Sequence, residues 1–122
     1  MLYVGEMSER EDVGDPDEKV TNGMVCRSLE RLNAAVSEKL AENRHKGGWS
    51  SAPISALAHR LREEVLEELL PEVVHLEFQT ETRADRIRAL QRLRREAADA
   101  GAFSMMIVDR CVDELSKLGV KV

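Results

Sequence analysis

The amino-acid sequence predicts an all-α protein: a helical bundle of three to four helices per chain, with a four-helix-bundle-type core completed by oligomerisation. Three observations predict this class. Apolar residues recur at steps of three and four, helix-starting and helix-stopping residues separate these stretches, and no segment alternates as a strand does. The chain of 122 residues has room for one domain. Because such helices cannot cover all their apolar faces alone, we expect a homodimer or homotetramer.

The first predicted helix runs from about Thr21 to Asn43. Its apolar residues share one face, because they lie three or four positions apart. They are Val25, Leu29, Leu32, Val36 and Leu40. Gly47 and Gly48 follow, and both disfavour continuation of the helix.

The second predicted helix begins near Pro53, because the segment Ser50-Ser51-Ala52-Pro53 supplies a hydroxyl cap and proline is favoured in a first helical turn. Its apolar stripe comprises Ile54, Leu57, Leu61, Val65 and Leu69. Pro71 is expected to end or kink this helix, since its ring lacks a backbone donor and crowds the preceding turn. Glu72 to Phe78 would form a short further turn.

The third predicted helix covers about residues 84–118. Thr82 and Asp85 resemble a capping box at its start, and Gly119 is placed to stop it. Gly101 is a candidate break within it, because glycine is a poor helix former.

Residues 1–19 are acidic and predict a flexible arm, which leaves residues 20–122 as a single helical domain. The N-terminus lacks the basic and apolar segments of a signal peptide, and no apolar run is long enough to span a bilayer. We therefore expect a cytoplasmic protein without a membrane partner. Cys26 and Cys111 lack the spacing of a metal or disulfide motif and are expected to be reduced.

The charge balance argues against nucleic-acid binding. The net charge is −5 and only 3% of residues are aromatic, whereas nucleic-acid binding needs a positive surface or stacking side chains. The arginine-rich stretch from Arg83 to Arg95 keeps that function open as a lesser alternative. A solvated helix face is the simpler interpretation of this stretch, and no nucleic-acid partner is expected.

Two predicted helices carry carboxylates on their apolar faces. Glu64 and Glu68 continue the leucine stripe of the second helix, and Glu96 and Asp99 precede Phe103 on one face of the third. Burying an unpaired carboxylate costs many kcal/mol. These side chains therefore require a proton, a cationic partner or a metal ion.

Two explanations fit this pattern. Acid pairs from two helices could converge on one ion, and ligation by oxygen alone suits Mg²⁺ or Mn²⁺. Alternatively, Arg92 and Arg95, each four residues before an acid, could form salt bridges along the third helix. Arginines account less well for the glutamates of the second helix at positions 63, 64, 67 and 68, which have only Arg60 and Arg62 nearby.

The acidic segments Glu63-Glu64-Val65-Leu66-Glu67 and Glu96-Ala97-Ala98-Asp99 form an E-E-x-x-E plus E-x-x-D pattern. Lys46-Gly47-Gly48-Trp49 and the segment from Phe103 to Asp109 accompany it. Over roughly residues 28–113 the chain resembles the MazG-like all-α NTP pyrophosphohydrolase superfamily, which includes dimeric dUTPases and dCTP pyrophosphatases, and especially a branch common in bacteriophages. Ala102 departs from the asparagine typical of that branch, which puts base or sugar selectivity in doubt.

The resemblance implies a Mg²⁺-dependent enzyme, with Mn²⁺ possible, that cleaves a (d)NTP to the monophosphate and pyrophosphate with a metal-activated water. The metal ligands it implies are Glu64, Glu67, Glu96 and Asp99. Glu63 is the further catalytic candidate, to hold the water or a second ion. The resemblance favours Glu67 over Glu68, although helical phase alone does not.

Five residues are expected to contact the nucleoside triphosphate: Lys46, Trp49, Arg92, Arg95 and Asp109. Lys46 could carry its charge to a distal phosphate, and Trp49 could stack on the base. The arginines could bind phosphate oxygens in a bidentate manner. The main rival function is a non-catalytic helical interaction or nucleotide-binding module, which would show no Mg²⁺ dependence.

Overall fold

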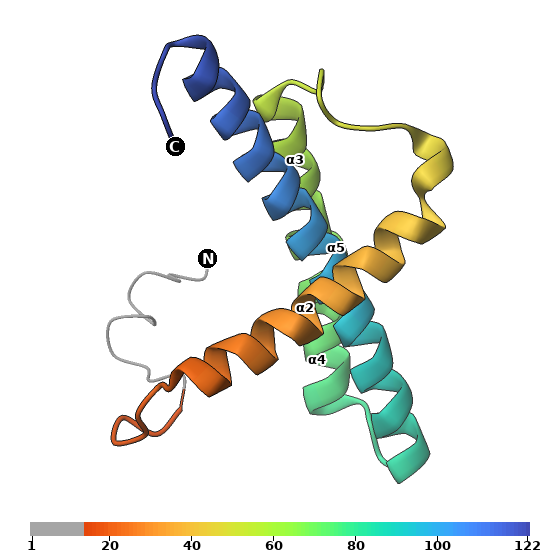
Figure 1. Ribbon diagram of the computed structural model, residues 1–122. Coiled ribbons are helices and arrows are strands. Elements are labelled where there is room, and N and C mark those ends of the chain that lie inside the picture. The colour runs from red at the N-terminus through yellow and green to blue at the C-terminus, as the bar shows by residue number, and fades with distance from the viewer. Residues whose placement is uncertain (1–13) are drawn as a thin grey trace. The chain divides into compact units, whose positions relative to one another are not determined.

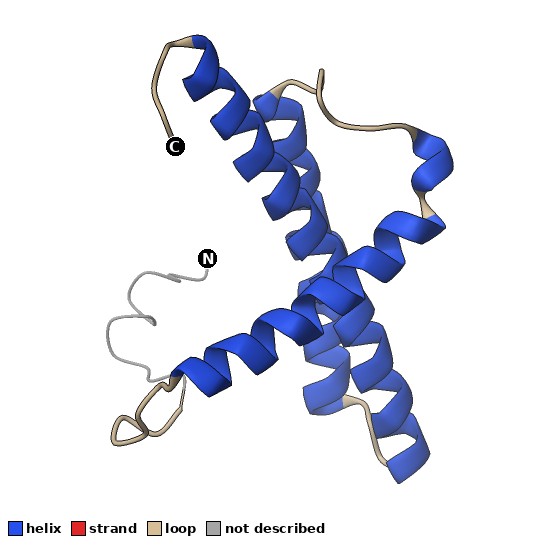
Figure 2. Cartoon of the chain, in the orientation of Figure 1, coloured by secondary structure: helices blue, strands red, loops and turns tan. Residues whose placement is uncertain are grey.

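The computed structural model describes residues 14–122. The flexible arm predicted over residues 1–19 falls mostly outside them and stays a prediction. The chain divides into two units, residues 1–30 and 31–122. In the first unit, Thr21 caps helix α2 (Asn22–Glu42), because its hydroxyl accepts the Met24 N–H at 3.1 Å. All regular structure in residues 14–122 is helical, which confirms the all-α class (Figure 2).

The second unit contains a long helical hairpin (Figure 1). Its first arm is a continuous helical stretch, and a short connection over residues 79–82 leads into its second arm. The first arm consists of α3 (Ile54–Glu63), η2 (Glu64–Leu69) and α4 (Leu70–Phe78). The second arm is α5 (Arg83–Lys117). The predicted cap is confirmed, since Thr82 Oγ1 accepts the Asp85 N–H at 3.0 Å.

The first arm does not end at Pro71. It widens into a π-helical turn over Glu64–Leu69, where the Leu70 N–H donates to the carbonyl of Val65, five residues back. A proline ring crowds the carbonyl four residues before it, and the wider turn just upstream relieves that crowding. Helix α4 therefore extends to Phe78, and the expected short turn is a full helix.

Helix α5 also runs unbroken through Gly101. A Cβ atom at this position would lie 3.2 Å from Leu32 Cδ1 and 3.3 Å from Val36 Cγ2. Glycine therefore lets the part of α2 beyond Arg31 approach α5 closely. The expected break at this residue is instead a packing contact between two helices.

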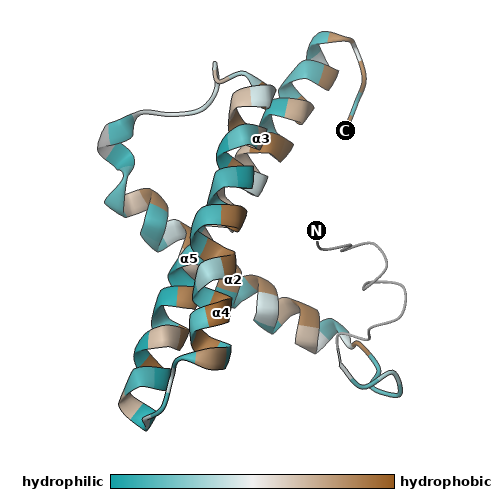
Figure 3. Ribbon diagram, turned by 180° about the vertical axis from the view of Figure 1, so that it is seen from behind, coloured by the Kyte–Doolittle hydropathy of each residue, from teal (hydrophilic) through white to brown (hydrophobic). Residues whose placement is uncertain are grey.

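The core of residues 31–122 is small. Its buried apolar residues are Val36, Leu57, Leu76, Ala89, Ala98 and Ala102. Within residues 14–122 no large side chain is fully buried, and many large apolar side chains are exposed. Figure 3 shows that hydrophobic and hydrophilic residues are interspersed along the helices. None of the helices in this part of the chain combines the length and apolar character that crossing a bilayer requires.

Candidate metal centre and adjoining cleft

Three carboxylates from the two arms of the hairpin converge. Glu64 stands at the first position of η2, and Glu96 and Asp99 lie one turn apart on α5. Each offers one oxygen atom, and these atoms lie within 4.8 Å of one another. Glu64 Oε2 is shielded from solvent and has no hydrogen-bond partner among residues 14–122. Three of the four carboxylates expected on apolar faces thus form a single cluster.

The cluster holds more negative charge than its surroundings neutralise. Burial raises the pKa of Glu64, and the charges of Asp99 and Glu96 raise it further. Burial likewise raises the pKa of Glu96, followed by the charges of Asp99 and Glu68. Arg60 opposes the first shift and Lys39 the second. Both raised pKa values mean that ionising these carboxylates side by side is costly without a further cation.

The two arginines of α5 that were proposed as partners of Glu96 and Asp99 interact with other carboxylates. Arg92 Nε donates to Glu72 Oε2 at 3.2 Å, and Arg95 Nη2 lies 3.7 Å from Glu42 Oε2. The cation that reaches the cluster is Lys39, whose Nζ lies 3.3 Å from Asp99 Oδ1. The salt-bridge alternative that paired Arg92 and Arg95 with acids of their own helix is therefore wrong.

The donor set suits a hard divalent cation. Three carboxylate oxygens match the ligands preferred by Mg²⁺ and Mn²⁺, and the unpartnered Glu64 Oε2 is an acceptor that such an ion would satisfy. Comparison with protein-family models, curated proteins and solved structures finds no match to this chain. The chemical assignment rests on these carboxylates and on what surrounds them.

Helical phase favours Glu68 of η2 as a neighbour of the cluster, whereas the resemblance favours Glu67. Glu67 is exposed and is not among the converging carboxylates. Glu68 is also exposed, yet its charge contributes to the raised pKa values of both Glu64 and Glu96. The residue four positions after Glu64 lies near its face both in an α-helix and in the wider π-helical turn. Glu68, rather than Glu67, is therefore the second glutamate of η2 whose charge acts on the acidic cluster.

Glu63 is held away from this role by its own helix. Its Oε1 lies 2.8 Å from His59 Nε2, and its Oε2 accepts from Arg60 Nη1 at 2.9 Å. Both oxygens are thus engaged one turn earlier on α3. A residue that holds the attacking water should lie with the three converging acids. The structure does not place Glu63 among them.

A cleft of about 710 Å³ opens directly beside the acids, with Glu64 and Asp99 in its wall. Lys46 and Trp49, which are expected to contact the nucleotide, also line it. Lys46 ends the short helix η1 (Arg44–Lys46), and Gly47 follows with a φ of 83°, a value that favours glycine. The volume lies within the range of small-molecule sites.

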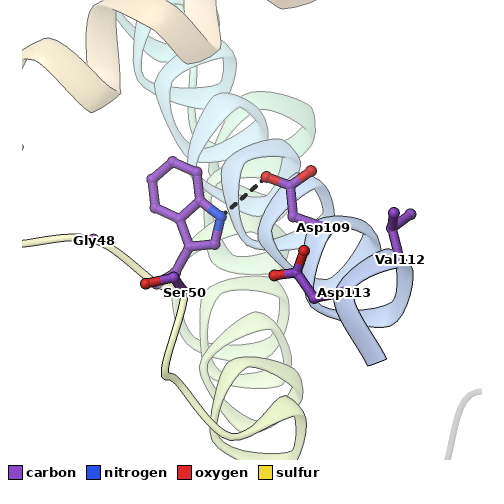
Figure 4. A pocket seen from close by; sticks show the side chains of 6 residues that line it. Gly48, Ser50, Asp109, Val112 and Asp113 are labelled. Carbon is purple, nitrogen blue, oxygen red and sulfur yellow. Dashed lines mark hydrogen bonds between the residues drawn. The ribbon is translucent and has the colours of Figure 1, made fainter. Parts of the chain in front are cut away.

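Asp109 contacts this region indirectly. Trp49 Nε1 donates to Asp109 Oδ2 at 3.1 Å, the dashed line of Figure 4. Buried Arg110 donates from Nε to the Ala52 carbonyl at 3.0 Å. Asp109 and Arg110, which are consecutive on α5, thus hold the connection between η1 and α3 by hydrogen bonds. Asp109 positions the tryptophan and lines a separate hollow with Gly48, so it is not part of the cleft wall.

Sequence reasoning missed several residues of the site. Lys39 and Arg44 line the cleft and add positive charge, and Phe103 packs beneath Arg60, whose Cζ lies 5.5 Å from the ring centre. Arg60 precedes Glu64 by four residues, which is a local signal for proximity. Lys39 offered no such signal, because only the packing of α2 on α5 brings it to Asp99.

Proposed function

We propose that this protein is a Mg²⁺-dependent nucleoside triphosphate pyrophosphohydrolase, with Mn²⁺ as an alternative ion. The observation that carries the proposal is the convergence of Glu64, Glu96 and Asp99 within 4.8 Å beside a cleft of about 710 Å³. The unpartnered Glu64 Oε2 supports it, because that oxygen requires a cation or a proton. The resemblance of the two acidic segments to MazG-like enzymes points to the same reaction.

The proposed reaction consumes one water molecule. Its oxygen bonds to the α-phosphorus of a (d)NTP while the bond from that phosphorus to the α–β bridging oxygen breaks, which yields the monophosphate and pyrophosphate. When bound, Mg²⁺ would neutralise charge on the phosphoryl oxygens and lower the pKa of the attacking water. Glu64, Glu96 and Asp99 would hold the ion, and Glu68, whose charge acts on Glu64 and Glu96, would accept a proton from the water.

The cleft offers side chains suited to both parts of a nucleotide. Lys39, Arg44 and Lys46 offer positive charge for the phosphate chain. Trp49 offers a flat apolar face for the base, and its indole is held in place by Asp109. We place this reaction in the cytoplasm, where (d)NTP substrates are made and used.

A pyrophosphate-release assay over a panel of NTPs and dNTPs tests the proposal. We expect monophosphate and pyrophosphate in equal amounts with Mg²⁺, and none after chelation with EDTA. Release of single phosphate groups would instead indicate cleavage at the γ position. If the protein cleaves none of these nucleotides and binds them equally well with and without Mg²⁺, the function is that of a non-catalytic nucleotide-binding module.

We also propose that the protein assembles as a homodimer or homotetramer. An exposed apolar stripe follows η2 and α4 at four-residue steps: Leu66, Leu70, Val74 and Phe78. Phe78 is 82% exposed, although such a side chain usually supplies much of a core. A second copy of this chain would cover the stripe and complete a helical bundle, which the small core of one chain leaves incomplete.

Sedimentation velocity tests this assembly. We expect Phe78→Asp to shift the protein from an oligomer to a monomer, because the charge would be buried without a partner in the interface. Leu118→Asp is the matched control, since Leu118 is 78% exposed but lies beyond the end of α5. A monomeric parent protein, or equal behaviour of the two variants, would contradict the proposal.

A further inference from the structure

A smaller groove adjoins the metal centre on the other side of Lys39. It has a volume of about 130 Å³ and lies between the part of α2 beyond Arg31 and α5. Lys39 lines both this groove and the large cleft, while Arg94 and Arg95 add two guanidinium groups to the groove alone. The groove therefore combines three cationic side chains with two carboxylates, Glu38 and Glu42, directly beside the acidic cluster.

One carboxylate already lies among these cations. Glu42 Oε2 is 3.6 Å from Lys39 Nζ and 3.7 Å from Arg95 Nη2. Lys39 is only 15% exposed and also contacts Asp99, so it connects the acidic cluster to the groove. Because Glu42 lies near two cations, Lys39 and Arg95, the electrostatic field at its carboxylate favours an anion.

Glu42 is weakly held in that position. Both of its distances exceed those of a strong charged hydrogen bond, about 2.7–2.9 Å. The Glu42 and Arg95 side chains are 44% and 62% exposed, and exposed ion pairs contribute little. Glu42 is also the last residue of α2, where the partial negative charge of a helix end disfavours a carboxylate. An anion of higher charge can therefore replace it.

We infer that Glu42 is an internal substitute for the distal phosphates of the substrate. In the free protein it neutralises Lys39 and Arg95, and the β- and γ-phosphates, which leave as pyrophosphate, displace it from the groove. The identity of this anion rests on the proposed function. The same competition gives Glu42 a role after cleavage, because its return to the two cations promotes the release of pyrophosphate.

Isothermal titration of the full chain with inorganic pyrophosphate, with and without Mg²⁺, tests this inference. Glu42→Gln removes the competing charge, and we expect the Kd for pyrophosphate to fall about three- to fivefold. Glu38→Gln is the matched control: it makes the same change of charge in the same groove, but Glu38 forms no ion pair within residues 14–122. We expect less than about a twofold change for it. Lys39→Met should raise the Kd about tenfold or more, with circular dichroism confirming its helical content.

The outcomes separate this inference from the proposed function. Equal Kd values for Glu42→Gln and Glu38→Gln, or absence of pyrophosphate binding by the parent protein, would overturn the role of Glu42. If Glu42→Gln binds pyrophosphate more tightly but no nucleotide is cleaved by any variant, the anion subsite stands and the proposed enzymatic function fails.

Discussion

Glu64→Gln is expected to lower the rate of pyrophosphate release at least about a hundredfold. The glutamine keeps the size of the side chain but removes the charge that an ion between Glu64, Glu96 and Asp99 would need. Losses of this size are typical when a central charged group of an active site is removed. Asp99→Asn is expected to behave similarly, because its oxygen belongs to the same cluster. The measurement is kcat and KM with a saturating Mg²⁺ concentration.

Glu77→Gln controls for a general effect of losing one carboxylate, because Glu77 is exposed on α4 and is not part of the acidic cluster. Its activity should equal that of the parent protein. If Glu64→Gln and Asp99→Asn retained parental activity as well, the measured activity would come from a contaminant or from another site. Either result would end the proposal for this cluster.

The fourth carboxylate can be identified in the same assay. The structure predicts a larger loss of activity for Glu68→Gln than for Glu67→Gln. Of these two glutamates, only Glu68 has a charge that acts on both Glu64 and Glu96. The two variants differ by one position and share the same change of charge, so each controls for the other. The opposite order would show that Glu67 is the ligand implied by the MazG-like pattern, and that the π-helical turn rearranges when an ion binds.

The second large effect concerns stability. Mg²⁺ is expected to raise the thermal midpoint at pH 7.5 by about 10 °C, because a ligand at a hundred times its Kd adds about 2.7 kcal/mol to a small domain. Without metal, the pKa values of Glu64 and Glu96 lie above the ordinary value of 4.5. Their contribution to stability is present in full below about pH 4.5 and is lost as the pH rises through the raised folded-state pKa values.

Differential scanning calorimetry at several pH values can separate these effects. Between pH 5 and pH 7.5 the ionising pair should destabilise the metal-free protein, whereas the stabilisation by Mg²⁺ should grow, since protons no longer compete for the carboxylates. Glu64→Gln should raise the metal-free midpoint at pH 7.5 by about 4 °C and should abolish the response to Mg²⁺. An equal response to NaCl of the same ionic strength would contradict a specific site.

The periodicity of the sequence was sufficient to predict the helices and the carboxylates that line their apolar faces. Helix formation depends on caps, spacing and breakers within a few residues, and the predicted starts near Pro53 and at about residue 84 are confirmed within a residue. The acids at positions 64, 96 and 99 were identifiable for the same reason: a charged residue on an apolar stripe is visible from local spacing alone.

Only the tertiary structure decided which groups meet at the site. Lys39 reaches Asp99, and Asp109 holds Trp49, across separations of dozens of residues that no local spacing encodes. The resemblance implied Glu67 and helical phase favoured Glu68, and in the folded chain Glu67 lies outside the converging carboxylates whereas the charge of Glu68 acts on Glu64 and Glu96. Local preferences set the helices, whereas the distances between their side chains depend on how those helices pack.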